Sequence, residues 1–113
     1  MAFRLEIRFN NLPGLGERVH RRCGDVVRKA TFDVEADAKQ RAPVDTGALK
    51  ASIQGKMIAP LTGEVVCGVH YGIYQEYGTR FQAGTPFLTP AVDQIRAPFF
   101  QAIGAAVREE LEG

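Results

Sequence analysis

The chain has 113 residues, of which 45% are hydrophobic and 24% charged, and its formal net charge at pH 7 is +1. This length and composition predict one globular domain over residues 1–113. The balanced charge argues against a domain specialised for polyphosphates, which usually has a large basic excess. No apolar run reaches the ~20 residues of a bilayer-spanning helix, so we expect no membrane partner.

Residues 3–9 alternate between apolar and charged side chains, with Phe3 and Leu5 on one side and Arg4 and Glu6 on the other. This period of two predicts a strand with one buried face, and it differs from the continuous apolar run of a signal peptide. The Asn, Pro and Gly residues at 10–16 predict a turn that ends the strand.

Residues 17–41 have apolar side chains at steps of three and four, which predicts a long amphipathic helix. Its apolar stripe consists of Val19, Cys23, Val26, Val27, Ala30 and Val34. Phe32 projects from the opposite, charged side of an unbroken helix. Either the helix changes register near Thr31, or the Phe32 ring contacts something outside the monomer.

Proline and glycine mark the centre of the chain. Pro43 ends the first helix, because a residue that precedes proline disfavours the α conformation. In the turn that follows, Asp45 can cap the next segment, and Gly47 permits a positive φ. Residues 52–69 then predict an antiparallel hairpin, with strands at 52–59 and 64–69 and a four-residue connection at 60–63.

The C-terminal part predicts a short helix at 71–77, a loop at 78–86 and a second long helix at 87–111. Gly78 suits the C-terminal cap of the short helix. Thr89 and Pro90 offer an N-cap and a first helical residue, whereas Pro98 is expected to kink or divide the long helix. The order of elements predicts an α+β fold, in which two long helices pack on a small antiparallel sheet made of the N-terminal strand and the hairpin.

Candidates for catalysis are few, and we expect no enzyme and no cofactor. His20 and Cys23, together with Cys67 and His70, have spacings that could close a zinc site, but Cys23 lies on the apolar stripe, where a thiol acts as a small hydrophobe. Two cysteines are also too few for a disulfide scaffold. A cluster of arginines and Lys29 on the first helix leaves a nucleic-acid-binding module as an alternative, although aromatic residues for base stacking and a DNA-reading motif are lacking.

Three segments carry a resemblance to a known family. They are residues 42–53 (APVDTGALKASI), the group Tyr71, Tyr74, Glu76, Tyr77, Gly78 and Thr79, and residues 86–91 (PFLTPA). Their order and spacing, with a long helix on each side, resemble the tail-component family of tailed bacteriophages named after phage Hong Kong 97. The resemblance covers residues 15–111.

The resemblance implies a non-enzymatic virion protein of the head–tail junction, assembled in the cytoplasm of the host bacterium. It implies a homo-oligomeric, six-fold ring that joins the connector or stopper protein to the tail terminator or tail tube protein and completes the tail. DNA would pass through its lumen without sequence recognition. A tail terminator, which caps the tube and fixes its length, is the alternative within the same class.

A closed ring needs two different complementary surfaces on each subunit. We expect one on the basic side of the first helix, around Phe32, and another on the segment that follows the hairpin, where residues 79–85 would order against a neighbour. The tyrosines at 71, 74 and 77 either anchor this contact or pack behind the hairpin. The candidate interface residues are Arg18, Arg22, Lys29, Phe32, Tyr74, Glu76, Tyr77, Thr79, Arg80 and Phe81. The structural turn residues are Pro43, Asp45, Thr46, Gly47 and Gly78.

Overall fold

The computed structural model describes residues 2–6, 16–42, 48–68, 76–79, 82–83 and 86–112. The elements in chain order are strand β1 (Ala2–Glu6), helix α1 (Glu17–Arg41), short helix α2 (Ala48–Ser52), strands β2 (Ile53–Ala59) and β3 (Thr62–Cys67), strands β4 (Gly78–Thr79) and β5 (Gln82–Ala83), and helix α4 (Leu88–Glu112). Two long helices and a small antiparallel sheet confirm the predicted α+β fold.

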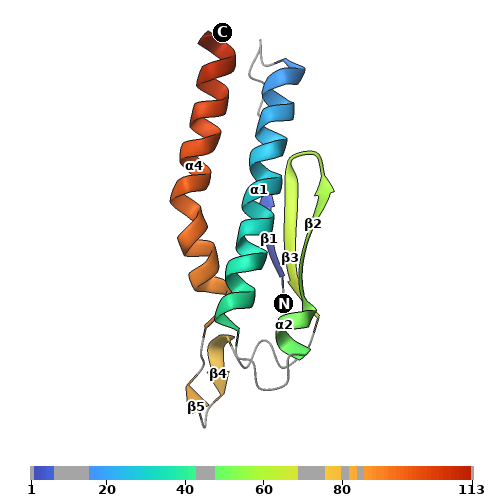
Figure 1. The fold of residues 1–113 in the computed structure, drawn as a ribbon, viewed down its shortest axis with the longest axis vertical. Coiled ribbons are helices and arrows are strands. Elements are labelled where there is room, and N and C mark those ends of the chain that lie inside the picture. Colours follow the sequence, from blue (N-terminus) through green and yellow to red (C-terminus); the bar gives the residue numbers. More distant parts are fainter. Residues whose placement is uncertain are drawn as a thin grey trace.

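The elements form three layers, with α1 between α4 and the sheet (Figure 1). The molecule extends 54 × 22 × 22 Å, and its radius of gyration is 16.4 Å. A compact domain of this length would have a radius of about 13 Å. The subunit is therefore a rod, and its α4 side and its sheet side face away from each other.

The three-stranded sheet has the order β1-β3-β2, and both pairings are antiparallel. On its outer face, Arg4 of β1 pairs with Glu64 of β3 at 3.0 Å. The hairpin differs from its prediction, because Thr62 and Gly63 already belong to β3 and only Pro60 and Leu61 connect the strands. The register shifts between Met57 and Ala59, near the tip. The predicted strand residues 7–9 lie outside the described residues.

Helix α1 has the predicted bounds and runs without interruption through Thr31. The register change considered for Phe32 therefore does not occur, and the Phe32 side chain is 41% exposed. The helix ends as expected before Pro43, since Ala42 is extended, with φ −66° and ψ 136°. Thr31 is an addition to the predicted buried stripe, and its hydroxyl donates to the Val27 carbonyl at 2.8 Å. This bond within the helix lets a polar side chain enter the core.

Glycines let α1 lie close to the hairpin. A Cβ atom added at Gly63 would lie 2.9 Å from the Thr31 Cβ and closer still to its hydroxyl. At the hairpin tip, a Cβ atom on Gly24 of α1 would lie 2.8 Å from the Pro60 carbonyl oxygen. Contacts this short are not available to real side chains, so these glycines set the separation between the helix and the sheet.

The C-terminal elements decide between the two outcomes expected for Pro98 and correct one other prediction. Pro98 does not divide α4, which remains one helix and bends near its middle (Figure 1). Part of the predicted loop at 78–86 forms a ribbon, in which β4 pairs with β5. Gly78 has a φ of 83°, which confirms the expectation of a left-handed conformation there. Of the predicted short helix at 71–77, only Glu76 and Tyr77 are described, and both are helical.

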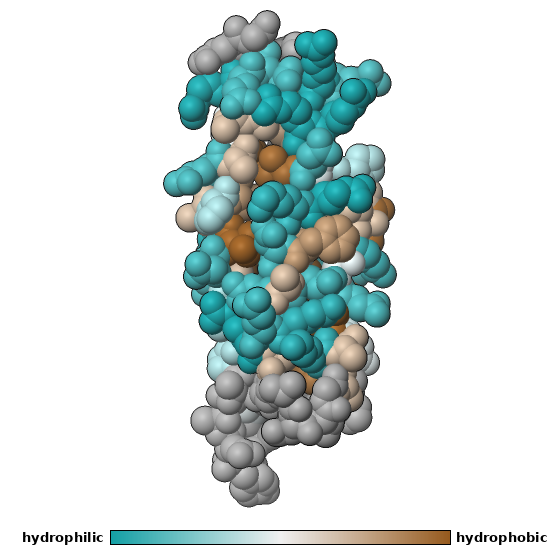
Figure 2. All heavy atoms as spheres, in the orientation of Figure 1, coloured by the Kyte–Doolittle hydropathy of each residue, from teal (hydrophilic) through white to brown (hydrophobic). Residues whose placement is uncertain are grey.

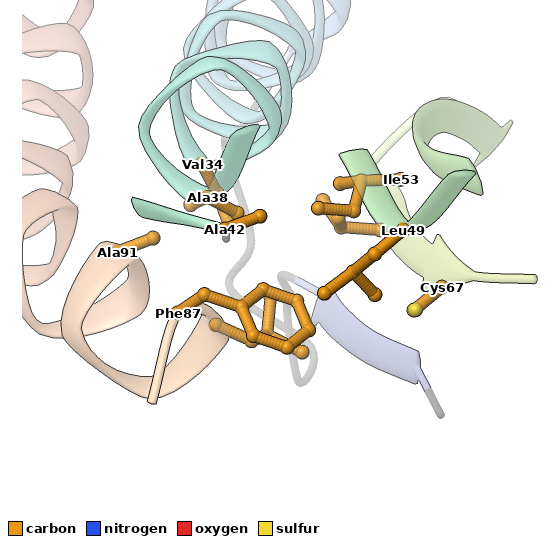
Figure 3. Close-up of a cluster of buried hydrophobic side chains, with 10 residues drawn as sticks. Val34, Ala38, Ala42, Leu49, Ile53, Cys67, Phe87 and Ala91 are labelled. Atoms are coloured by element: carbon orange, nitrogen blue, oxygen red, sulfur yellow. The ribbon is translucent and has the colours of Figure 1, made fainter. Parts of the chain in front are cut away.

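Buried side chains form two clusters along the rod. The larger surrounds Phe87, whose ring points from the start of α4 toward Leu49 and Ile53 (Figure 3). Val34 and Ala38 of α1, Ala42 just after it and Ala91 of α4 also belong to it. The smaller cluster joins Val19, Cys23 and Ala106 where the two long helices pack together.

Candidate interaction surfaces

The basic side of α1 is partly neutralised within the subunit. Arg22 reaches across to α4, where it pairs with Glu109 and, at 3.4 Å, with Glu110. The hydrogen bond to Glu109 raises the pKa of the Arg22 guanidinium above its ordinary value. Lys29 pairs with Asp33 at 2.7 Å, whereas Arg18 is exposed near the start of the helix. Two of the three basic interface candidates on α1 therefore contact acidic residues of their own chain.

Hydrophilic side chains cover the ends of α1 and α4 at the top of Figure 2, and apolar side chains appear lower down in the seam between the helices. The exposed ring of Phe32 lies on the outer side of α1, one turn beyond Lys29. Single exposed rings are common on protein surfaces, but a ring on a charged helix face, as here, is a candidate contact. The structure thus leaves part of the Phe32 ring open to a partner.

Glu76, which the sequence analysis placed at an interface, is buried inside the subunit, with only 3% of its surface exposed. Its carboxylate accepts hydrogen bonds from the backbone N–H groups of Phe87 at 3.2 Å, Leu88 at 2.7 Å and Thr89 at 3.3 Å. Pro90, the next residue, has no N–H to satisfy. A distant carboxylate therefore caps the N-terminus of α4, where the helix dipole also favours a negative charge.

Helix α4 starts one residue after the predicted bound at 87, and Glu76 supplies its cap. Thr89 is not the N-cap and Pro90 is not the first helical residue, because the helix begins at Leu88. The remaining candidates near Glu76 differ in position. Tyr77 is 72% exposed, and Thr79 lies in β4. Tyr74, Arg80 and Phe81 lie outside the described residues, as do Pro43, Asp45, Thr46 and Gly47 of the turn motif.

A groove of about 600 Å³ lies between the first half of α1 and the hairpin tip. We call it the α1–hairpin groove. Its apolar part is formed by Met57, Ile58, Ala59 and Pro60, and Ile58 is 43% exposed. Its α1 side carries both signs of charge, because Arg21 and Arg28 lie beside Glu17 and Asp25. A surface of this kind suits a protein partner better than a polyanion, which would require a uniformly basic lining.

The two cysteines considered as zinc ligands lie in different buried clusters. Cys23 belongs to the smaller buried cluster and Cys67 to the cluster around Phe87, whereas His70 lies outside the described residues. Burial raises the pKa of the Cys23 thiol, which disfavours the thiolate that a metal or an electrophile would need. Within the described residues, no group of three or more metal-binding side chains is present.

Residues 7–78 match the family model described as "Bacteriophage HK97-gp10, putative tail-component". The match spans more than half of the chain and includes α1, α2 and the hairpin. The chain belongs to this phage tail-component family. The resemblance seen in the sequence is thereby confirmed, and with it a structural role in a bacteriophage tail. Comparison with curated proteins and with solved structures gives no match.

The tail component has surface features that the sequence analysis missed. Phe100 of α4 is 65% exposed, more than Phe32 or Ile58. Its signal in the sequence is the stretch from Ala97 to Val107, which contains no charged residue although only one side of the helix packs on α1. None of the described helices combines the length and hydropathy of a membrane span.

Proposed function

We propose that the tail component works as a non-enzymatic ring subunit at the junction between the phage head and tail. Six copies would close around a lumen through which DNA passes without sequence recognition. One side of the ring would contact the connector or stopper protein, and the other the tail terminator or tail tube protein. The ring would be assembled in the cytoplasm of the host and would remain in the virion.

The observation that carries this proposal is the arrangement of exposed apolar side chains on a subunit of the tail-component family. Phe100 lies on α4 and Ile58 on the hairpin, at opposite outer layers of the rod, and Phe32 lies on α1 between them. A closed ring has a heterologous interface, so each copy must present two different surfaces on two sides. The layered rod meets this geometric requirement.

The proposed mechanism is positional. The rod is long and narrow, and several charged side chains of its described surface form ion pairs, such as Arg22 with Glu110 and Lys39 with Glu35. Neighbours in a ring would bury the remaining apolar side chains and stabilise each subunit. The ring would then match the connector on one side and the tail on the other by shape.

Changing Phe32 to aspartate should leave a folded subunit but reduce the joining of heads to tails at least about tenfold. A charge on a partly exposed position costs little in the monomer, whereas a charge in a desolvated contact costs about 2 kcal/mol or more. Joining can be measured as infectious titre after purified heads, tails and the variant are mixed. Gln54→Asp on the exposed face of β2 is the matched control. Wild-type titres with Phe32→Asp would remove Phe32 from the interface.

Phage lacking the gene provide the test of the junction role. We expect DNA-filled heads and separate tails of normal length in electron micrographs of such lysates. Tails of abnormal length would instead assign the chain to tail termination. Joined, infectious particles without the protein would overturn both assignments.

A further inference from the structure

One face of α4 lies opposite the face that packs on α1, and it is apolar or uncharged over two turns. It consists of Ala97, Phe100, Gln101 and Gly104, which fall within an arc of roughly 100° at 100° per residue. We call it the α4 outer face. All four residues are exposed. A surface helix normally carries charged or polar residues on this side, so the pattern is typical of a helix that is covered on both sides.

Gly104 is a second indication that a partner covers the α4 outer face. Glycine within a helix lowers its stability relative to alanine, and it is usually explained by a close neighbour. Gly24 and Gly63 have such neighbours within the subunit, but a Cβ atom at Gly104 would meet no atom within 4 Å. Nothing in the described part of the subunit requires a glycine there. A partner molecule that approaches the helix backbone beside Phe100 would require one.

The α1–hairpin groove offers a complementary surface on the other side of the rod. It is concave and large enough for an aromatic side chain, and its apolar part is formed by the hairpin tip around Ile58. Figure 1 shows α4 and the hairpin on opposite sides of α1. The two surfaces of one copy therefore cannot meet, whereas those of successive copies can, in the head-to-tail manner that a ring requires.

The charges around both surfaces favour a second copy as the occupant. The α4 outer face is preceded by Asp93 and Arg96 and followed by Arg108 and Glu109, so both signs are present at each end. The α1 side of the groove has both signs as well. Such mixed rims allow ion pairs between copies of one chain, whereas a nucleic acid or a strongly acidic protein would favour one sign.

We propose that the α4 outer face of one subunit docks in the α1–hairpin groove of the next, with Phe100 seated against Ile58. This inference rests on the proposed function, because the proposed ring would close through this contact. Phe100 is the anchor of the contact, and Gly104 allows the neighbouring hairpin tip to approach the helix.

Two single variants test the contact. Phe100→Asp disrupts the α4 outer face but leaves the groove intact. Ile58→Asp disrupts the groove but leaves the α4 outer face intact. At about 100 μM the wild-type chain should self-associate in sedimentation velocity experiments, and each variant alone should raise the dissociation constant about 100-fold, as for the loss of an interface anchor. Both positions are exposed, and circular dichroism checks that the variants fold. Should either aspartate variant unfold, Phe100→Ser and Ile58→Ser replace the pair.

Mixing the two variants gives the decisive result. The Ile58→Asp copy keeps Phe100 and the Phe100→Asp copy keeps its groove, so the mixture should form a dimer with one intact contact and nothing larger. The two aspartates have the same charge and cannot restore the second contact. A mixture that stays monomeric, a wild-type chain that does not associate, or a Phe100→Asp chain that associates normally would overturn the proposed contact. The test uses the isolated protein, so its failure is distinguishable from a failure of the junction role, which is measured in particles.

Discussion

Replacing Glu76 with alanine is expected to destabilise the folded chain by about 3–5 kcal/mol. The carboxylate is buried and accepts bonds from three backbone N–H groups at the start of α4. Each hydrogen bond to a charged group contributes about 1.5–3 kcal/mol, and buried donors left without an acceptor cost about 1–3 kcal/mol. The Phe87 backbone N–H is one of the capped groups, so the packing of the Phe87 ring in the larger cluster would also loosen. Urea denaturation followed by circular dichroism measures the loss.

Glu76→Gln is the matched control for this prediction. The amide oxygen can still accept the bonds from Phe87 and Leu88, but the negative charge at the helix N-terminus is lost. We expect a loss of about 1–2 kcal/mol, well below that of the alanine variant. Equal losses for both variants would show that the charge, rather than the set of hydrogen bonds, holds the cap. An unchanged alanine variant would contradict the cap altogether.

Gly63→Ala should destabilise the fold by about 2–3 kcal/mol, because the added methyl group overlaps the side chain of Thr31. Thr31 is buried against β3 and cannot turn away without leaving its bond to the Val27 carbonyl. Overpacking of this kind typically costs 1–3 kcal/mol. The change is measured as a lowered midpoint of urea denaturation with an unchanged slope.

Two further variants separate the steric overlap from the effect of removing a glycine. Gly104→Ala changes a helical glycine in open space, so it should raise stability by about 0.5–1 kcal/mol. Thr31→Ala in the Gly63→Ala background removes both the hydroxyl and the methyl group that the added Cβ would meet, so it should recover part of the loss. A double-mutant cycle measures this coupling. If Gly63→Ala and Gly104→Ala change stability alike, α1 does not approach β3 as closely as described.

The long helices could be predicted because their periodicity extends over many turns. The stripe of apolar residues in α1 and the Ala42-Pro43 pair set its bounds, and Gly78 stood out as a position for positive φ. Contacts between distant residues carry no such pattern. The cap that Glu76 provides for α4 crosses ten residues or more, and the local signal at Thr89 and Pro90 pointed to a different start. Buried Thr31 was missed because the predicted stripe contained apolar residues only. Its burial is possible because its hydroxyl bonds a carbonyl of its own helix, which the sequence pattern does not show.

The candidate surfaces were predictable in part. Phe32 could be found because a lone aromatic residue interrupts a charged helix face. Phe100 could not be found in the same way, because it adjoins Phe99 in an apolar stretch where only the packing against α1 tells the two sides apart. Several other interface candidates, among them Tyr74, Arg80 and Phe81, lie outside the described residues and stay predictions.

The central claim is that this tail component is a ring subunit between head and tail, and cryo-electron microscopy of the native particle tests it most directly. The account predicts a closed ring of this chain at the head–tail junction, with each α4 lying against the hairpin of the adjacent copy. Density for the rod elsewhere in the particle, or no density for it at all, would contradict the account.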